Sequence, residues 1–322
     1  MVGRGAIVGK VCVIGSTNLD FTVRVPRLPR SGETVSGGEL SLSTGGKGAN
    51  QAVAARRLGA DVQFVTLLGQ DPMGDRLAEA LAGAGLAPDA VLRTAAAPTG
   101  VALIAVDPEG RNQIAVAPGA NHQLSVDLVR AHADTLGWAD VVLLQLETPL
   151  ETVRWTLGEA RRRGKITVLN PAPARVLPLP ADLMPLVDYL TPNEGEAGLL
   201  TGREIHTPAD VEAAGMALVR AGVGAAIVTV GGAGAILTRR GGAIRVPGFT
   251  VVPVDTVGAG DAFNGGLAAL LAAGAPIEEA LLVANAAGAL TCTRPGAVDA
   301  LPTRAEVEGL MQREGRCPAT AW

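Results

Sequence analysis

A glycine-rich turn followed by an acidic residue is the pattern in this sequence that most clearly indicates chemistry. The segment 254–266 reads VDTVGAGDAFNGG, which is typical of an extended stretch, a turn and a helix start. Gly258 and Gly260 allow tight backbone conformations, so N–H groups at the helix start can converge on an anion. Asp261 follows in the first helical turn, where a carboxylate would repel a phosphate unless it engages the attacking hydroxyl. The pattern therefore favours phosphoryl transfer with Asp261 as the base.

Two common phosphate-binding loops are excluded at this segment. A Walker A loop ends in Gly-Lys-Ser/Thr, and no lysine follows Gly265 or Gly266. The dinucleotide fingerprint needs a third glycine at the position of Phe263. Taken alone, Asp261 could still be an acidic residue that merely favours the positive end of the helix dipole.

A second glycine-rich helix start occurs nearer the N-terminus. Residues 45–51 read GGKGANQ, and Lys47 is the only lysine in any glycine-rich loop of the chain. Gly48 stands where a Walker loop would need a hydroxyl residue, so this is a different kind of loop. Because glycines lack a side chain, the backbone here can approach a ligand closely.

Two further segments suit a nucleotide, although each has a structural alternative. Residues 229–234 read TVGGAG after an expected strand, so their backbone could contact a nucleotide or form a plain hairpin turn. Asn193 and Glu196 lie three residues apart at an expected helix start and share a face. They suit either a capping pair or a role near Mg²⁺-bound phosphates.

Polar side chains at the ends of expected strands are of types that suit a sugar. Asn18 and Asp20 follow the first strand, Glu147 follows a later strand, and Asn50 belongs to the glycine-rich helix start. Ligands in open α/β sheets collect at the carboxyl ends of strands, and a polyol needs paired acceptors and amide groups. Each of these residues could equally be a turn or helix-start residue.

The composition restricts the class of protein. The chain has 322 residues and a net charge of −4, with 48% hydrophobic and only 2% aromatic residues. This suits one large α/β domain, or two modest ones, with a core of small aliphatic side chains. The sequence has neither the basic stripe of a nucleic-acid-binding protein nor cysteine spacing typical of a metal site. It has no pattern typical of a signal peptide, and Pro276 interrupts its longest apolar region, so we expect a cytoplasmic protein without a membrane partner.

Alternating strand and helix patterns predict an α/β fold, a three-layer sandwich with a central, mostly parallel sheet. Strands are expected at residues 6–14, 62–68, 141–146, 166–169, 225–230, 235–238 and 243–246. Helices are expected at residues 50–58, 74–84, 126–136, 149–163, 193–200, 209–221, 259–272, 277–290 and 304–312.

Short strands interrupt this alternation in the first third of the chain. They are expected at residues 21–25 and 34–42 and in a hairpin of residues 101–106 and 113–117. They predict a small β lid drawn from about residues 18–45 and 98–118, although ordinary edge strands of the main sheet are an alternative. Residues 1–312 are expected to form a single domain, and residues 313–322 a frayed C-terminal tail.

These segments together resemble the ribokinase-like carbohydrate kinase family. The runs 45–55 and 255–265 carry the most specific part of the resemblance, which extends over nearly the whole chain. Supporting matches lie at residues 15–20, 32–34, 99–103, 145–151, 170–175, 191–196 and 247–249.

The resemblance implies ATP-dependent phosphorylation of D-ribose at its 5-hydroxyl, with Asp261 as the catalytic base. The implied anion hole consists of Gly258, Ala259 and Gly260. The residues implied to hold ribose, together with Asp261, are Asn18, Asp20, Gly46, Lys47, Asn50 and Glu147. The residues implied to line the ATP site are Asn193, Thr229, Gly231, Gly232, Gly234 and Asn285, with Glu196 influencing Mg²⁺ and phosphate.

The resemblance also implies a monovalent cation, usually K⁺, behind the anion hole, and a homodimer formed through the lid strands. The implied cation site consists of Asp255, Val257, Thr291, Arg294 and Gly296. The family commonly has a serine where this chain has Ala300, which puts one cation ligand in doubt.

Two other functions are compatible with the sequence. The acceptor could be another pentose, a deoxyribose or a nucleoside, although the chain has only four phenylalanines with which to hold a base. A non-catalytic sugar-binding regulator could share the fold. Binding alone requires neither Asp261 nor the complete turn at residues 258–260, so their presence favours an enzyme.

Overall fold

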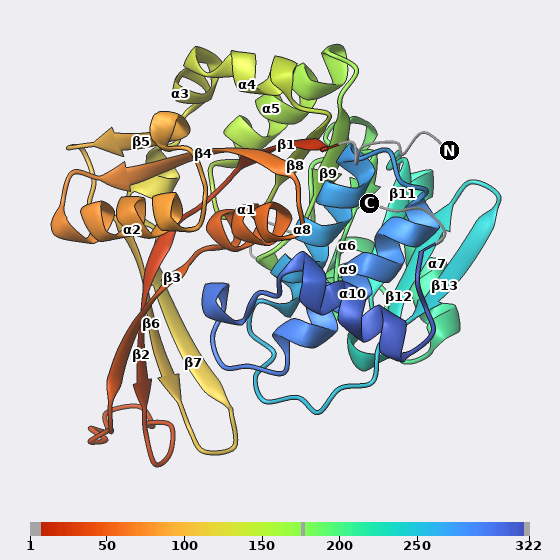
Figure 1. Cartoon of the computed structure of the whole chain (residues 1–322). Helices are drawn as coiled ribbons and strands as arrows, with labels where there is room; N and C mark the ends of the chain where they lie inside the picture. Colours follow the sequence, from red (N-terminus) through yellow and green to blue (C-terminus); the bar gives the residue numbers. More distant parts are fainter. Residues whose placement is uncertain (1–7, 175–177, 319–322) are drawn as a thin grey trace.

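The larger of two β-sheets forms the centre of the molecule (Figure 1). The structure is a computed structural model that describes residues 8–174 and 178–318. Residues 6 and 7 of the first expected strand and residue 175 of the matching run 170–175 lie outside these ranges. In spatial order the strands of this sheet are β13 (Gly242–Pro247), β12 (Gly234–Arg239), β11 (Ala225–Thr229), β10 (Tyr189–Leu190), β9 (Ile166–Leu169), β8 (Val141–Leu144), β1 (Lys10–Ile14), β4 (Asp61–Gly69) and β5 (Val91–Thr94). Within it, β12 and β13 are antiparallel to their neighbours and the other pairings are parallel.

Helices cover both faces of this sheet, as the strand pattern requires. Val11 and Val13 of β1 pack into one apolar core, whereas Cys12 and Ile14 pack into the other, because successive side chains point to opposite faces. The first face is covered by α1 (Lys47–Arg57), α2 (Pro72–Gly83), α8 (Ala259–Ala272), α9 (Ile277–Thr291) and α10 (Arg304–Arg313). The second is covered by α3 (Val126–Ala131), α4 (Ala133–Trp138), α5 (Leu150–Arg162), α6 (Glu194–Thr201) and α7 (Pro208–Arg220).

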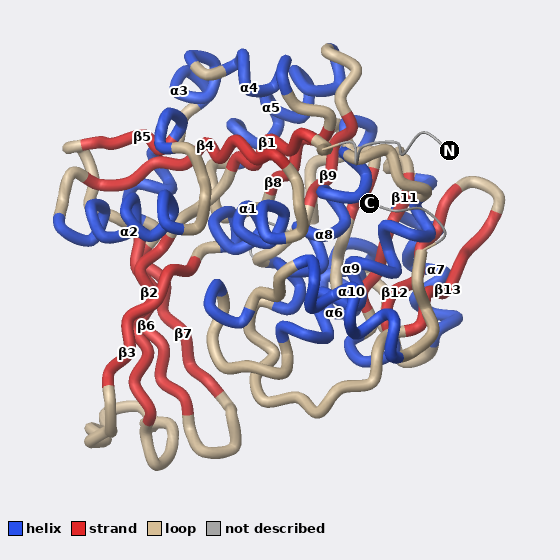
Figure 2. Tube along the Cα trace, in the orientation of Figure 1, coloured by secondary structure: helices blue, strands red, loops and turns tan. Residues whose placement is uncertain are grey.

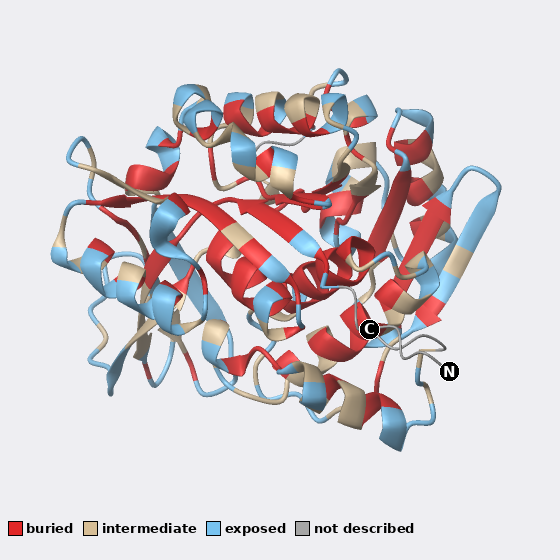
Figure 3. Cartoon of the chain, turned by 45° about the horizontal axis from the view of Figure 1, so that its top comes forward, coloured by how far each residue is buried: buried red, intermediate tan, exposed pale blue. Residues whose placement is uncertain are grey.

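The three-layer α/β sandwich predicted from the sequence is therefore confirmed. Figure 3 shows the buried central strands between helices that expose only their outer sides. No helix in the two described ranges is both long and apolar enough to cross a bilayer.

Three details differ from the sequence-based expectation. The helix expected at residues 126–136 is broken at His132, whose carbonyl accepts the hydroxyl of Thr135 at 2.7 Å. The strand expected at residues 34–42 lies at 40–45 instead, where it pairs with a neighbouring strand. The short strands β5 and β10 were not predicted, because pairing with neighbours rather than apolar alternation defines them.

The early short strands form a separate sheet in the order β3 (Leu40–Gly45), β2 (Asn18–Arg24), β6 (Gly100–Val106) and β7 (Asn112–Ala117). It extends away from the main body in Figure 2, so the alternative of edge strands in the main sheet is wrong. The strand register places Asp20 beside Ser43 and Ala102 on one face. The opposite face is more apolar, since Phe21 there pairs with both Leu42 and Leu103.

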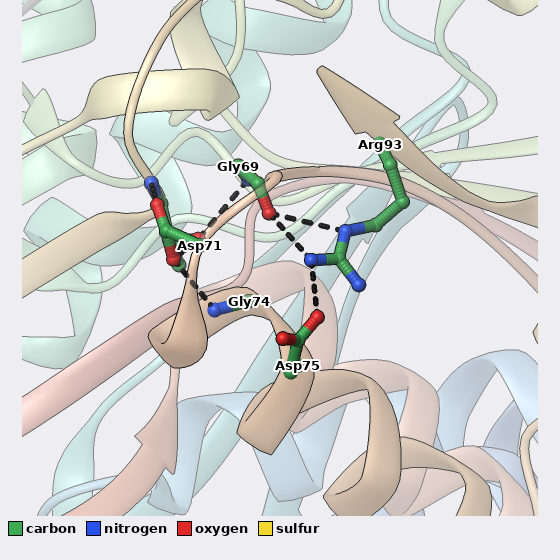
Figure 4. Close-up of polar contacts among 6 residues, drawn as sticks. Gly69, Asp71, Gly74, Asp75 and Arg93 are labelled. Atoms are coloured by element: carbon green, nitrogen blue, oxygen red, sulfur yellow. Dashed lines mark hydrogen bonds and ion pairs between the residues drawn. The ribbon is translucent and has the colours of Figure 1, made fainter. Parts of the chain in front are cut away.

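Asp71 connects this small sheet to the main body (Figure 4). Its carboxylate accepts the N–H of Gly74, which caps α2, and the N–H and hydroxyl of Thr99, all at 2.8 Å. Thr99 immediately precedes β6, and Arg93 of β5 holds the carbonyl of Gly69 at the end of β4. One side chain therefore joins a helix start to the root of a lid strand.

The segment that follows α10 contacts the main body through Arg316. Helix α10 continues to Arg313, and the Arg316 guanidinium lies over the ring of Phe249, 4.0 Å from its centroid. Arg316 also donates to the carbonyls of Pro247 and Gly248. Residues 319–322 of the expected tail lie outside the described ranges.

We expect Asp71→Ala to lower the free energy of unfolding by about 1–3 kcal/mol, because it removes a helix cap and leaves Thr99 without its acceptor. Burial acts to raise the pKa of Asp71, but hydrogen bonds from Thr99 and Gly74 outweigh it and hold the pKa below its ordinary value. The stabilisation is therefore fully present above that ordinary value and is lost as pH falls through the lowered one.

Urea denaturation of the unaltered protein, Asp71→Ala and a control variant, at neutral and acidic pH, measures this loss of stability. Asp127→Ala, which changes an exposed acid in the first turn of α3, is the matched control and should cost less than about 0.5 kcal/mol. Equal losses in the two variants would contradict the role assigned to Asp71.

Candidate active site

Asp261 lies in the first turn of α8 and is only 7% exposed. Both of its carboxylate oxygens accept amide hydrogens from α1: Asn50 Nδ2 lies 2.8 Å from Oδ2, and Gln51 Nε2 lies 2.9 Å from Oδ1. The two helices approach closely because of Gly265, where a Cβ would lie 2.5 Å from the Cβ of Ala54. A buried acid is thus held by side chains from a distant part of the sequence.

The turn before Asp261 has the conformation expected of an anion hole. Gly258 caps α8 with a φ of 80°, a left-handed conformation that favours glycine, and a Cβ there would lie 3.2 Å from the Cα of Ala297. Ala259 and Gly260 begin the helix, where the N–H groups have no intrahelical partners and the dipole is positive. An anion bound here would lie next to the Asp261 carboxylate.

The surroundings of Asp261 raise its proton affinity. Burial is the main cause and raises the pKa, while Lys47, Asn50 and Gln51 favour the ionised form and only partly offset it. The resulting pKa lies above the ordinary value of an aspartate. A raised pKa is suited to a general base, which must accept a proton during the reaction.

The loop at residues 45–48 lies against the end of β1 and holds Glu147. The carboxylate of Glu147 accepts the hydroxyl of Ser16 and the backbone N–H of Lys47, the latter at 2.9 Å. Gly46 has a φ of 87°, and a Cβ there would lie 2.9 Å from the backbone nitrogen of Asn18. Burial acts to lower the pKa of the Lys47 ammonium, but three nearby carboxylates (Asp261, Glu147 and Glu196) raise it overall.

Two glycines of the small sheet make room for polar side chains of β2. A Cβ at Gly45 would clash with the carboxylate of Asp20, and one at Gly100 would clash with the amide of Asn18. Asn121 donates to Asn18 Oδ1 at 2.8 Å, which leaves the nitrogen of that amide for a ligand. Burial, followed by repulsion from Glu147 and Asp261, raises the pKa of Asp20 to about 7.

The structure thus brings the residues predicted to hold a sugar to one place, between the small sheet and the start of α8. Hydrogen bonds, close approaches and electrostatic interactions connect them. The set consists of Asn18, Asp20, Gly46, Lys47, Asn50, Glu147 and Asp261.

A cavity of about 650 Å³ begins at the other side of the anion hole. Of the residues predicted for the nucleotide and anion sites, its lining includes Asn193, Thr229, Gly231, Gly232, Gly234, Ala259, Gly260 and Asn285, but neither Gly258 nor Glu196. Phe249, Phe263 and Cys292 also line it and were not predicted. Asn285 donates to the carbonyl of Val246 at 3.0 Å, which holds α9 against the end of β13.

Asn193 and Glu196 form a reciprocal capping box at the start of α6. The side chain of Asn193 accepts the N–H of Glu196 at 2.8 Å, and the side chain of Glu196 accepts the N–H of Asn193 at 2.9 Å. The capping pair, which the sequence offered as the alternative to a role near phosphates, is therefore observed. Burial raises the pKa of Glu196, which is partly offset by its hydrogen bond from Asn193 and by Lys47.

The residues predicted for a monovalent cation gather behind the anion hole. Asp255 accepts the N–H of Val257 and the N–H of Gly296, each at 3.0 Å. Thr291 ends α9, where the negative end of the dipole favours a cation, and its carbonyl accepts the N–H of Arg294 at 3.4 Å. The Arg294 guanidinium pairs with Glu306 of α10, so this residue offers its backbone carbonyl. Ala300 is fully buried, and its side chain supplies no oxygen.

The sequence-based reasoning missed the side chains that support the site from behind. Gln51 contacts Asp261, although it belongs to the glycine-rich helix start, and Asn121, which lies between the expected hairpin and the next expected helix, contacts Asn18. Their local patterns carry no signal for these contacts, since each joins residues more than a hundred positions apart.

Comparison with known proteins identifies the family. The model of the pfkB family of carbohydrate kinases matches residues 8–304. The chain belongs to this family of carbohydrate kinases. The buried acid in the first turn of α8 is compatible with the activity of this family.

Similar proteins extend the likeness over nearly the whole chain. A ribokinase from Haemophilus influenzae is 38% identical over 91% of this chain and 95% of its own length. A deoxyribokinase from Salmonella typhi is 35% identical over 91% of this chain and 95% of its own length. The structure of Arabidopsis thaliana ribokinase complexed with ribose and ATP has a TM-score of 0.87 and 32% identity, covering 95% of this chain and 99% of that one.

We expect the KM for the sugar to rise about tenfold between about pH 8 and pH 6, because Asp20 must be ionised to accept two hydroxyls. With a pKa of about 7, this carboxylate is mostly ionised at the upper pH and mostly protonated at the lower one. Steady-state kinetics at saturating ATP measures the effect. Asp20→Asn should weaken binding and remove this pH dependence, whereas a flat KM in the unaltered protein would contradict the assignment.

Proposed function

We propose that this kinase transfers the γ-phosphoryl group of ATP to the 5-hydroxyl of D-ribose. The observation that carries the proposal is the position of Asp261, between a set of polar side chains suited to a polyol and an anion hole that opens into a cavity. The names of the ribokinase relatives support the choice of sugar and nucleotide.

In this mechanism each part of the site has one task. The Asp20 and Glu147 carboxylates and the Asn18 and Asn50 amides orient the sugar, which places its hydroxyl beside the base. Asp261 accepts the hydroxyl proton while the hydroxyl oxygen attacks the γ-phosphorus. The bond to the β–γ bridging oxygen breaks, and the N–H groups at the start of α8 stabilise the charge on the transferring group.

The aromatic residues argue against a nucleoside acceptor. Phe21 lies on the face of the small sheet opposite Asp20, and Phe64 lies in the core. Phe249 and Phe263 line the nucleotide cavity. Within the described residues, no phenylalanine is therefore available at the sugar site to stack on a base. A deoxyribose or another pentose remains the main alternative acceptor.

ATP would bind as its Mg²⁺ complex, and Glu196, at the start of α6, would act on the metal-bound phosphates. Mg²⁺ is commonly held by phosphates and waters with one or two carboxylates, which fits the two acids, Glu194 and Glu196, in the first turn of α6. The donors behind the anion hole are carbonyls and the Asp255 carboxylate, and such oxygens suit K⁺. K⁺ held there by Asp255 would steady the backbone that precedes Gly258, and because the side chain of Ala300 supplies no oxygen, we expect a weaker dependence on K⁺.

The small sheet serves as a lid over the sugar and as the contact surface of a homodimer. Its face opposite Asp20 carries Leu40 and Leu103, which are 58% and 57% exposed. A second copy covering this face would remove both side chains from water. Because ATP is the donor, we place this activity in the cytoplasm.

The direct test is a coupled ADP-release assay with ribose, 2-deoxyribose, other pentoses and adenosine. We expect turnover to be highest with ribose and slow without sugar, because a closed site excludes water. If turnover is higher with 2-deoxyribose than with ribose, deoxyribose is the acceptor instead. If no sugar supports turnover, the protein is a sugar-binding protein rather than a kinase.

Asp261→Asn should lower kcat about 100-fold or more while leaving ribose affinity, measured by calorimetry, within a few-fold of the unaltered protein. The substitution keeps the size of the side chain but removes the base. Asp75→Asn is a matched control, since Asp75 lies in the first turn of α2, away from the site. Near-normal turnover of the Asp261 variant would exclude this residue from the mechanism.

Leu103→Glu should convert the dimer to a monomer, because a charge on the exposed apolar face would be buried without a partner. Light scattering after size-exclusion chromatography measures the mass. Leu199→Glu, at a 60% exposed position on α6, should leave the mass unchanged. A monomer before any substitution, or a dimer that survives Leu103→Glu, would contradict dimerisation through the lid.

A further inference from the structure

We propose that Gln51 is a positioning residue for the phosphoryl transfer: it holds Oδ1 of Asp261, so that Oδ2 is the oxygen that takes the hydroxyl proton. This inference deepens the proposed function and rests on it. It assigns different tasks to the two amides that contact the acid, Asn50 and Gln51.

The surroundings of the two amides differ. Asn50 Oδ1 has no hydrogen-bond partner among the described residues, so this side chain has capacity left for the sugar. Gln51 is fully buried, and every polar atom of its amide is used. Its Oε1 accepts Gln145 Nε2 at 2.6 Å, and its Nε2 donates to Asp261 Oδ1 at 2.9 Å and to Asn170 Oδ1 at 3.1 Å.

The orientation of the Gln51 amide is fixed by an atom that can only accept. The backbone carbonyl of Thr191 accepts a hydrogen bond from Asn170 at 3.0 Å, so the nitrogen of the Asn170 amide must face it. The oxygen of Asn170 then faces Gln51 and requires a donor there. Gln51 Nε2 is therefore directed at both Asn170 and Asp261, and its oxygen at Gln145.

The same network reaches the helix that carries the acid. The hydroxyl of Thr191 donates to Asn264 Oδ1 at 2.6 Å, and Asn264 Nδ2 donates to the carbonyl of Gly260 at 2.8 Å. Asp261 and Asn264 of α8 are therefore both held by the buried network that contains Gln51, Asn170 and Thr191. The network fixes the carboxylate relative to the anion hole before any ligand binds.

These contacts determine which oxygen is the base. When Asn50 turns to the sugar, Oδ2 of Asp261 loses its amide partner and becomes available to the hydroxyl. Oδ1 keeps its hydrogen bond from Gln51, which favours the ionised acid. The proton moves from the hydroxyl oxygen to Oδ2 as the new P–O bond forms and ADP leaves, and it is released to water after the product departs.

The test is the pH dependence of kcat at saturating sugar and ATP, which reports groups in the substrate complex. The acidic limb of this profile is the pH range in which kcat falls as Asp261 becomes protonated. Gln51→Met keeps the size of the side chain but removes the donor, so the midpoint of the acidic limb should rise by about one pH unit. Gln51→Glu places a like charge beside Asp261 and should move it further. The KM values for sugar and ATP should stay within about twofold, since Gln51 contacts neither ligand.

Gln63→Met is the matched control. Gln63 lies on β4 and points away from the face covered by α8, so its substitution should leave the limb in place. If Gln51→Met does not fold, Gln145→Met provides the second test, because it frees the Gln51 amide to turn and should give a smaller shift in the same direction.

The inference is overturned if folded Gln51 variants keep the acidic limb within about 0.2 pH units of the unaltered protein, or if only their KM values change. Failure of the proposed function gives a different result, namely no ribose turnover in the unaltered protein. The pH comparison is then made with whichever sugar the assay shows to be phosphorylated.

Discussion

The close contact between α1 and α8 is the constraint on which the site depends. It allows two amides of α1 to reach a carboxylate that is almost fully buried at the start of α8. Burial raises the pKa of such an acid, and the amides together with Lys47 provide the opposing interactions. The balance gives a base with a raised proton affinity beside a group of N–H donors, which is what transfer of a phosphoryl group to an alcohol requires.

Glycines determine how closely the remaining parts can approach this centre. Those at the roots of the small sheet give Asn18 and Asp20 the space that a Cβ would occupy, and Gly258 gives the anion hole its left-handed turn. The small sheet is in turn connected to the main body through Asp71. The proposed sugar site therefore lies between the α/β body and the small sheet, which Asp71 joins to that body.

Much of this arrangement could be predicted from the sequence because its signals are local. The turn before Asp261, the alternating strands and helices and the hairpin of the small sheet each follow from neighbouring residues. The partners of Gln51 could not be predicted, since three segments must fold together before Gln145, Asn170 and Asp261 meet. The contact of Arg316 with Phe249 was missed for the same reason, and a tail was expected instead.

The most direct measurement is a crystal structure with ribose and a non-hydrolysable ATP analogue bound together. We expect the 5-hydroxyl to lie within hydrogen-bonding distance of Asp261 Oδ2, opposite the γ-phosphoryl group at residues 258–260, while Gln51 still holds Oδ1. A carboxylate turned away from the sugar, or a sugar bound far from the start of α8, would contradict it.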